Sequence, residues 1–86
     1  MKLQFSRQFK KRKKKLPVRV GKRLEERLLL FSEDPFNPVL RNHVLAGEYA
    51  GYRSIDITGD WRAVYETQLG DVAYFVDVGT HAYLYG

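Results

Sequence analysis

Three runs of residues with the composition and alternation of β-strands follow one another in the second half of the chain. They cover residues 52–58, 61–67 and 72–78. Gly59-Asp60 separates the first two runs, and Leu69-Gly70-Asp71 separates the last two. Turn residues of this kind between strand-like runs are typical of β-hairpins. The sequence therefore predicts three consecutive antiparallel strands, joined by two short turns.

The first half of the chain predicts a strand and two helices. In residues 1–5, Leu3 and Phe5 alternate with polar residues and would share one face of a short strand. Ser6 is a candidate N-cap for a basic helix over residues 6–16, which should end before Pro17. A second helix is expected to have Pro17 at its first position and to stop near Ser32. One face of that helix carries its apolar residues, at helical spacing: Val20, Leu24, Leu28 and Phe31.

Residues 34–50 read as a long irregular connection, and connections of this length in small domains are often functional. The tail, residues 79–86, is expected to form a turn or a single helical turn. The order of elements is strand, helix, helix and three strands. It predicts one α+β domain over residues 1–86, with two helices packed on one face of a small antiparallel sheet.

Composition narrows the class of protein. The chain has 86 residues and no cysteine, which excludes a disulfide scaffold and a cysteine-based zinc site or nucleophile. No stretch is apolar enough to be a membrane span, so we expect a cytoplasmic protein with no membrane partner. The net charge is +5, and the basic residues are concentrated between positions 7 and 27. This asymmetry indicates a polyanion or an acidic protein as partner.

Alternation along the strands divides their side chains between two faces. Three sets are expected to face the helices: Ile55 and Ile57; Trp61, Ala63 and Tyr65; and Tyr74, Val76 and Val78. The other, open face would then collect Ser54, Asp56, Arg62 and Asp77. His81 and Tyr85 follow the last strand, and His43 lies in the long connection. Two interpretations stay open at this point, which are a charge cluster in solvent and a functional site.

Two blocks of the chain resemble a known family. Residues 41–65, RNHVLAGEYAGYRSIDITGDWRAVY, and residues 75–86, FVDVGTHAYLYG, are similar to the RelE/ParE superfamily of bacterial toxin–antitoxin toxins. Within it, the YafQ-like and RelE/StbE-like mRNA interferases are the most similar subgroup. The most specific matches are His43-x-Leu45, Gly51-Tyr52-Arg53, Asp60-Trp61-Arg62, Val64-Tyr65, Gly79-Thr80-His81 and Leu84-Tyr85. The resemblance covers nearly the whole chain and implies the RelE-like fold.

The resemblance also implies an activity: a type II toxin that cleaves mRNA at the ribosome and is silenced by a cognate antitoxin. Cleavage would proceed by attack of a ribose 2′-OH on the adjacent phosphate, without metal or cofactor. By this likeness the catalytic residues would be His43, Asp60, Arg62, His81 and Tyr85. The histidines would act as base and acid, Arg62 would hold the phosphate, and Tyr85 would stack on a base or assist proton transfer. Asp60 would orient a histidine or cap the turn. The residues expected to contact RNA are Lys10, Lys11, Lys13, Lys14 and Arg53.

The chain departs from the YafQ-like pattern at two positions. Asp56 stands where the pattern has a histidine, and Asp77 stands where it has an arginine. Carboxylates on a phosphate-binding face oppose phosphate binding. Two alternatives to the nuclease therefore stay open: a ParE-like inhibitor of DNA gyrase, and an RNA-binding member with weakened or no catalysis.

Overall fold

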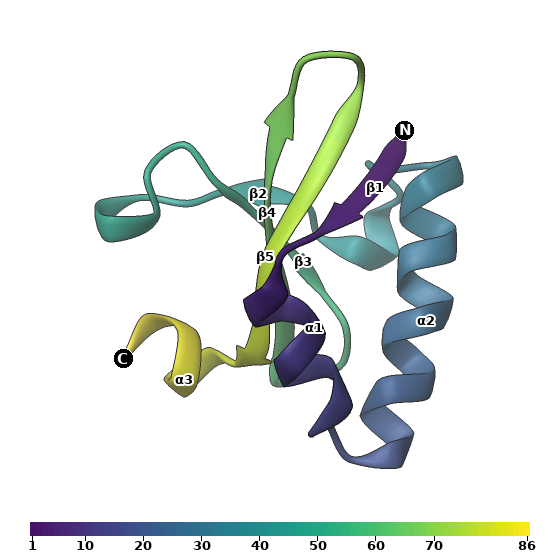
Figure 1. Cartoon of the computed structure of the whole chain (residues 1–86), viewed down its shortest axis with the longest axis vertical. Helices are drawn as coiled ribbons and strands as arrows, with labels where there is room; N and C mark the ends of the chain where they lie inside the picture. Colours follow the sequence, from purple (N-terminus) through teal and green to yellow (C-terminus); the bar gives the residue numbers. More distant parts are fainter.

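A computed structural model describes residues 1–86 and contains a five-stranded sheet, three α-helices and two short 3₁₀ turns (Figure 1). In chain order the elements are β1 (Lys2–Phe5), α1 (Arg7–Lys14), α2 (Val18–Glu33), η1 (Pro38–Leu40), β2 (His43–Val44), η2 (Gly47–Tyr49), β3 (Arg53–Asp56), β4 (Trp61–Gln68), β5 (Val72–Thr80) and α3 (His81–Tyr85). The predicted α+β class and order of elements are confirmed. None of the helices combines the length and the apolar content that a bilayer-spanning helix needs.

The sheet differs from the predicted one in two respects. Its strand order is β1-β5-β4-β3-β2, and β1 runs parallel to β5, so the sheet is mixed rather than antiparallel. The second difference is β2, a two-residue strand that pairs antiparallel with β3 inside the segment expected to be irregular. Two residues are too few to show the alternation by which a strand is recognised in sequence. Because of β2, His43 lies on the sheet edge instead of in a loop.

The two N-terminal helices pack on one face of the sheet, as predicted. The Ser6 hydroxyl caps α1 by accepting a 3.0 Å hydrogen bond from the Phe9 N–H. Pro17 is the N-cap of α2 rather than its first residue. The buried residues of α2 are the four predicted from their spacing, Val20, Leu24, Leu28 and Phe31. Together with Phe9 of α1 they pack against Ile55, Ile57, Ala63, Tyr65, Ala73, Phe75 and Val78 of the sheet region.

The side chains of β5 do not all point to the predicted faces of the sheet, because β5 has a β-bulge where it pairs with β4. Tyr65 pairs with Phe75 and Val64 pairs with Asp77, which leaves Val76 without a partner. Before the bulge the core residues are Ala73 and Phe75, so the predicted assignment of Tyr74 and Val76 to the core is wrong. The extra residue shifts the alternation by one, so beyond it Val78 faces the core and Asp77 the opposite face, as predicted.

The second face of the sheet is partly covered. Figure 1 shows α2 on one side of the sheet and η2 and α3 on the other. Ser54 and Val64 lie on this second face, yet both are completely buried. The prediction that Ser54 is exposed on an open face is therefore wrong, because the C-terminal helix brings Tyr85 over it.

Candidate active site

Strand pairing aligns polar side chains in two rows across the second face. His43 pairs with Ser54 on the next strand, and Asp56 pairs with Arg62. Directly opposite residues on neighbouring strands project from the same face of a sheet. These rows form the floor of a cavity of about 410 Å³. The cavity is lined by Arg41, His43, Leu45, Ala46, Ser54, Asp56, Arg62, His81 and Tyr85.

Two arginines in this cavity share one carboxylate. Asp56 Oδ1 lies 3.0 Å from Arg62 Nε, and Asp56 Oδ2 lies 3.6 Å from Arg41 Nε. Arg62 Nη1 also donates to the carbonyl oxygens of Thr58 and Trp61, at 3.0 and 3.1 Å. Arg62 is thus held by three polar partners and its side chain is only 16% exposed, whereas the Arg41 side chain is 74% exposed. With neutral histidines, the cavity carries one net positive charge.

The backbone next to β2 fixes the ring of His43. His43 Nδ1 lies 2.7 Å from the carbonyl oxygen of Arg41. A carbonyl oxygen can only accept a hydrogen bond, so Nδ1 carries the hydrogen and the neutral ring has its lone pair on Nε2. Arg41 adopts a left-handed backbone conformation, with φ at +45°, which directs this carbonyl to the ring. His43 is exposed and lines the cavity, so Nε2 is available as a base.

The C-terminal helix positions His81 and Tyr85. Thr80 caps α3 by accepting a 3.1 Å hydrogen bond from the Tyr83 N–H, and the His81 N–H donates to the Asp60 carbonyl oxygen at 3.0 Å. His81 and Tyr85 are four residues apart on α3, and their ring centroids lie 4.9 Å apart. The Tyr85 hydroxyl is 3.1 Å from Ser54 Oγ. The helix is therefore attached to the sheet at both its ends.

Position 79, the first of the Gly-Thr-His motif, is occupied by glycine because the Tyr83 ring packs closely against it. A Cβ atom at this position would lie 2.4 Å from Cδ2 of Tyr83. Real Cβ atoms do not approach another carbon this closely, so a larger residue would displace the Tyr83 ring. Gly79 also pairs with Arg62 on β4, so the Tyr83 ring packs on the strand next to the arginine of the cavity floor.

Four of the five predicted catalytic residues line the cavity, namely His43, Arg62, His81 and Tyr85. Asp60 does not line it: its side chain is exposed, and only its backbone carbonyl contributes, by holding the first N–H of α3. Arg41 was missed by the sequence reasoning. Its only sequence signal was its place two residues before His43 in the motif-bearing segment.

The residues predicted to contact RNA lie outside the cavity. The four lysines, Lys10, Lys11, Lys13 and Lys14, are exposed on α1, and Lys13 is 3.8 Å from Glu25. Arg53 pairs with the core residue Tyr65 and therefore lies on the helix-covered face. It donates to Asn42 Oδ1 at 2.8 Å and lies over the Phe36 ring, so it holds the connection in place. No group of three or more His, Asp or Glu side chains is arranged to hold a metal ion.

Of the two carboxylates that depart from the expected pattern, only Asp56 lines the cavity. Asp77 Oδ1 accepts a 2.9 Å hydrogen bond from the Val78 N–H. Asp77 is close enough to Tyr49 to affect its ionisation: burial raises the pKa of the Tyr49 phenol, and the Asp77 charge raises it further. Asp56 therefore places its negative charge in the cavity itself, whereas Asp77 acts on the neighbouring tyrosine.

The fold, with two N-terminal helices on a five-stranded mixed sheet and a short C-terminal helix, is that of the RelE-like toxins. A YoeB/ParE toxin from Agrobacterium tumefaciens has the same fold at 22% identity, with 94% of this chain and 99% of that chain covered and a TM-score of 0.76. The family described as "Bacterial toxin of type II toxin-antitoxin system, YafQ" matches residues 1–86. This chain belongs to the YafQ family of type II toxin–antitoxin toxins.

Solved structures of YafQ support this assignment. YafQ from Escherichia coli is 25% identical, with 98% of this chain and 97% of that chain covered and a TM-score of 0.76. In the E. coli DinJ–YafQ complex the corresponding chain is 29% identical, with the same coverage and a TM-score of 0.68. No curated protein sequence matches this chain. The predicted superfamily and subgroup are therefore confirmed.

Proposed function

We propose that this toxin is an endoribonuclease that cleaves mRNA by attack of a ribose 2′-OH on the adjacent phosphate. The observation that carries the proposal is that one cavity brings together two imidazoles, two guanidiniums and a phenol. This set can accept a proton, donate a proton and stabilise an anionic phosphorane, which is all that this reaction requires. The chemistry of these groups needs no metal ion.

His43 is the base in this mechanism. Its Nε2 lone pair takes the proton of the 2′-OH as the 2′-oxygen forms a bond to phosphorus. The bond between Nδ1 and the Arg41 carbonyl stabilises the imidazolium that results, because it holds the second N–H on an acceptor. The products are a 2′,3′-cyclic phosphate and a free 5′-hydroxyl.

His81 is the acid. As the bond from phosphorus to the 5′-oxygen breaks, protonated His81 gives its proton to that oxygen. The His81 ring packs against Tyr85 with centroids 4.9 Å apart, which restricts its orientation. Tyr85 is held in turn by its hydroxyl contact to Ser54. These contacts position the ring before substrate arrives.

Arg62 and Arg41 bind the phosphate oxygens. Arg62 is held by Asp56 and two carbonyl groups, so it offers a fixed charge, while Arg41 is exposed and can follow the substrate. A bound phosphate competes with Asp56 for both arginines. We expect this competition to lower the affinity for RNA without removing the binding site.

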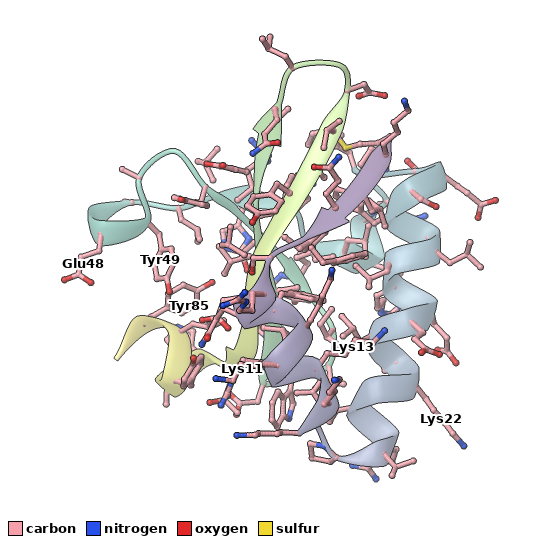
Figure 2. All side chains as sticks on the ribbon, viewed as in Figure 1. Lys11, Lys13, Lys22, Glu48, Tyr49 and Tyr85 are labelled. Atoms are coloured by element: carbon pink, nitrogen blue, oxygen red, sulfur yellow. The ribbon has the colours of Figure 1, made fainter.

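The partners follow from the family. YafQ from E. coli has been solved in the DinJ–YafQ toxin–antitoxin complex, and we propose a cognate antitoxin as partner of this chain. The exposed lysines of α1 would contact ribosomal RNA phosphates, which are targets independent of sequence. Figure 2 shows Lys11 and Lys13 on α1, which is packed beside α3 through Tyr83. The reaction would take place in the cytoplasm, on translating ribosomes.

The test compares mRNA cleavage by the wild type and by His43→Gln and His81→Gln, using purified ribosomes and mapping of the new RNA ends. Each variant should lose about 10²-fold or more in rate, as is typical when a positioned acid or base is removed. Tyr74→Phe is the matched control, because Tyr74 lies on β5 outside the cavity. Cleavage by both histidine variants at the wild-type rate would refute the mechanism.

One alternative has a specific observation in its favour. The ion pair between Asp56 and Arg62 is what a cavity without catalysis would show, since its charges satisfy each other. A protein of that kind would bind RNA with a steep salt dependence and release no product. The cleavage assay decides between the two, and a supercoiling assay in parallel tests the ParE-like inhibition of DNA gyrase.

A further inference from the structure

A second cavity adjoins the first and is lined by aromatic side chains. Its volume is about 580 Å³, and it shares Ala46 and Tyr85 with the first cavity. Tyr49 of η2 and Tyr83 of α3 complete its aromatic lining. Figure 2 shows Tyr49 and Tyr85 pointing toward one another from η2 and α3. The mechanism described above uses neither Tyr49 nor Tyr83.

The tyrosines of this cavity are held in place by their neighbours. Tyr49 meets Tyr85 edge to face, with centroids 5.7 Å apart and planes at 84°. The Arg12 guanidinium covers the Tyr83 ring at 3.8 Å from its centroid, and Gln8 Nε2 donates to the Tyr83 hydroxyl at 3.0 Å. Tyr83 nevertheless remains 43% exposed. Fixed aromatic rings with exposed surface are the means by which proteins stack single-stranded bases.

The two cavities differ in charge, so each favours a different part of a nucleotide. The first cavity is lined by two arginines, whereas Glu48 is the one charged residue that lines the second, and Arg12 lies behind the Tyr83 ring without lining that cavity. Asp77 lies near Tyr49 and adds negative charge on the same side. A phosphate is therefore favoured in the first cavity and disfavoured in the second. An uncharged flat group that presents hydrogen-bond donors is favoured in the second cavity, where Glu48 can accept from it.

We propose that the second cavity is a base-binding subsite for the nucleotide on the 3′ side of the scissile phosphate. This inference rests on the proposed function. His81, the acid for the leaving 5′-oxygen, packs on Tyr85, and Tyr85 is the side chain common to both cavities. The nucleotide that carries the leaving oxygen is therefore the one beside the second cavity. A purine is preferred to a pyrimidine, because its larger face stacks more strongly.

The experiment uses dinucleotides with a single phosphodiester, which have only one phosphate to place in the first cavity. The 5′ residue is a 2′-deoxynucleotide, so the dinucleotide is bound but not cut. The fluorescent base 2-aminopurine stands on the 3′ side in one probe and on the 5′ side in the other. Wild-type protein should quench the 3′ probe more strongly. Tyr49→Leu and Tyr83→Leu should each bind the 3′ probe about tenfold more weakly, and Tyr74→Leu should bind it as the wild type does.

An abasic 3′ residue completes the test. The wild type should bind the abasic dinucleotide about tenfold more weakly than the complete one, and Tyr49→Leu should lose nothing further on it. Stronger quenching of the 5′ probe, equal binding of the abasic and complete dinucleotides, or wild-type binding by both leucine variants would overturn the subsite. These readouts do not need cleavage. A quenched 3′ probe together with uncut ribosomal mRNA would refute the nuclease alone, and mRNA cleavage without 3′-base dependence would refute the subsite alone.

Discussion

Asp56 on β3 and Arg62 on β4 face each other directly across the sheet, with Oδ1 and Nε 3.0 Å apart and both side chains only 16% exposed. Both residues line the cavity of the candidate active site. The guanidinium that we propose to bind the scissile phosphate therefore already has a carboxylate partner. In the proposed mechanism substrate must compete with that carboxylate, so we expect Asp56 to weaken RNA binding.

Replacing Asp56 by Asn should change stability and RNA binding in opposite directions. The amide oxygen can still accept from Arg62, but the half-buried arginine loses its counter-charge, at a cost of about 1–2 kcal/mol in the free energy of unfolding. RNA binding should tighten by about fivefold, equivalent to about 1 kcal/mol, because the repulsion of phosphate is removed. Urea denaturation and titration with an uncleavable RNA measure the two effects.

Asp77→Asn is the matched control for this variant. It removes a carboxylate from the same face of the sheet, at a residue that does not line the phosphate-binding cavity. RNA binding should change by less than a factor of two with this substitution, if the argument about position is right. An equal gain for both variants would show that net charge, and not the pairing with Arg62, controls binding.

Substitutions at Arg41 can separate the effect of its side chain from the effect of its backbone conformation. Its φ of +45° is unfavourable for a residue with a Cβ, by about 1 kcal/mol, whereas glycine adopts it freely. The greater chain entropy of glycine in the unfolded state offsets most of that relief. Arg41→Gly should therefore leave the free energy of unfolding within about 0.5 kcal/mol of the wild type. The slope of log K against log salt for single-stranded RNA should fall by about 0.7, the value of one phosphate contact.

The Arg41 prediction depends on the exposed guanidinium reaching the substrate. Arg41→Ala is the companion variant, since it also removes the side chain but keeps the unfavourable backbone conformation. Both substitutions should weaken RNA binding equally. Wild-type salt dependence in both variants would exclude Arg41 from phosphate binding.

Gly79→Ala should disturb the C-terminal helix. The new methyl group would have to displace the Tyr83 ring, which is packed under the Arg12 guanidinium. Overpacking of this kind costs about 1–3 kcal/mol. Thermal unfolding measures this loss, and cleavage should fall with it because α3 carries His81. In Gly79→Ala combined with Tyr83→Ala the clash is absent, so the methyl group should no longer destabilise the protein beyond the effect of Tyr83→Ala alone.

Stability in alkali should report on Tyr65, which is buried in the core. Burial raises the pKa of its phenol above the ordinary value of 10.0, although the hydrogen bond from Asn42 and the charge of Arg53 lower it in part. The unfolded chain then loses this proton at a lower pH than the folded protein does. The stabilisation is complete below pH 10 and is lost as the pH rises above it.

Tyr65→Phe should flatten this dependence. The variant would be less stable at pH 8, by about 1 kcal/mol, because the hydrogen bond with Asn42 is lost. Its free energy of unfolding should then fall less steeply than that of the wild type between pH 9.5 and 11. Parallel curves for the two proteins in denaturant titrations would contradict the assignment.

Much of the fold could be read from local patterns in the sequence. The apolar face of α2, the Ser6 cap and the two hairpin turns all depend on spacings within a few residues, and the structure confirms each. The parallel pairing of β1 with β5 depends on residues about 70 positions apart, which no local pattern encodes. The bulge at Val76 escaped prediction for a related reason, because it becomes visible only when two strands are aligned.

The residues of the candidate site could be predicted from the sequence where they belong to a motif of the family. His43, Arg62, His81 and Tyr85 were identified from their resemblance to a family, and they line one cavity. Asp60 was identified in the same way, but its contribution comes through a backbone carbonyl, which a side-chain motif does not specify. The role of Arg41 depends on a left-handed backbone conformation and on a carboxylate 15 positions further along the chain. Neither relationship can be seen in sequence.

We propose that the cavity formed by His43, Arg62 and His81 cleaves RNA through the ribose 2′-OH. The most direct measurement uses a ribosome-bound mRNA with a single 2′-deoxy substitution at the nucleotide 5′ to the mapped cut. The substitution should abolish cleavage at that position, and the unsubstituted mRNA should yield a 2′,3′-cyclic phosphate and a 5′-hydroxyl. Undiminished cleavage of the substituted mRNA, with 5′-phosphate ends, would contradict it.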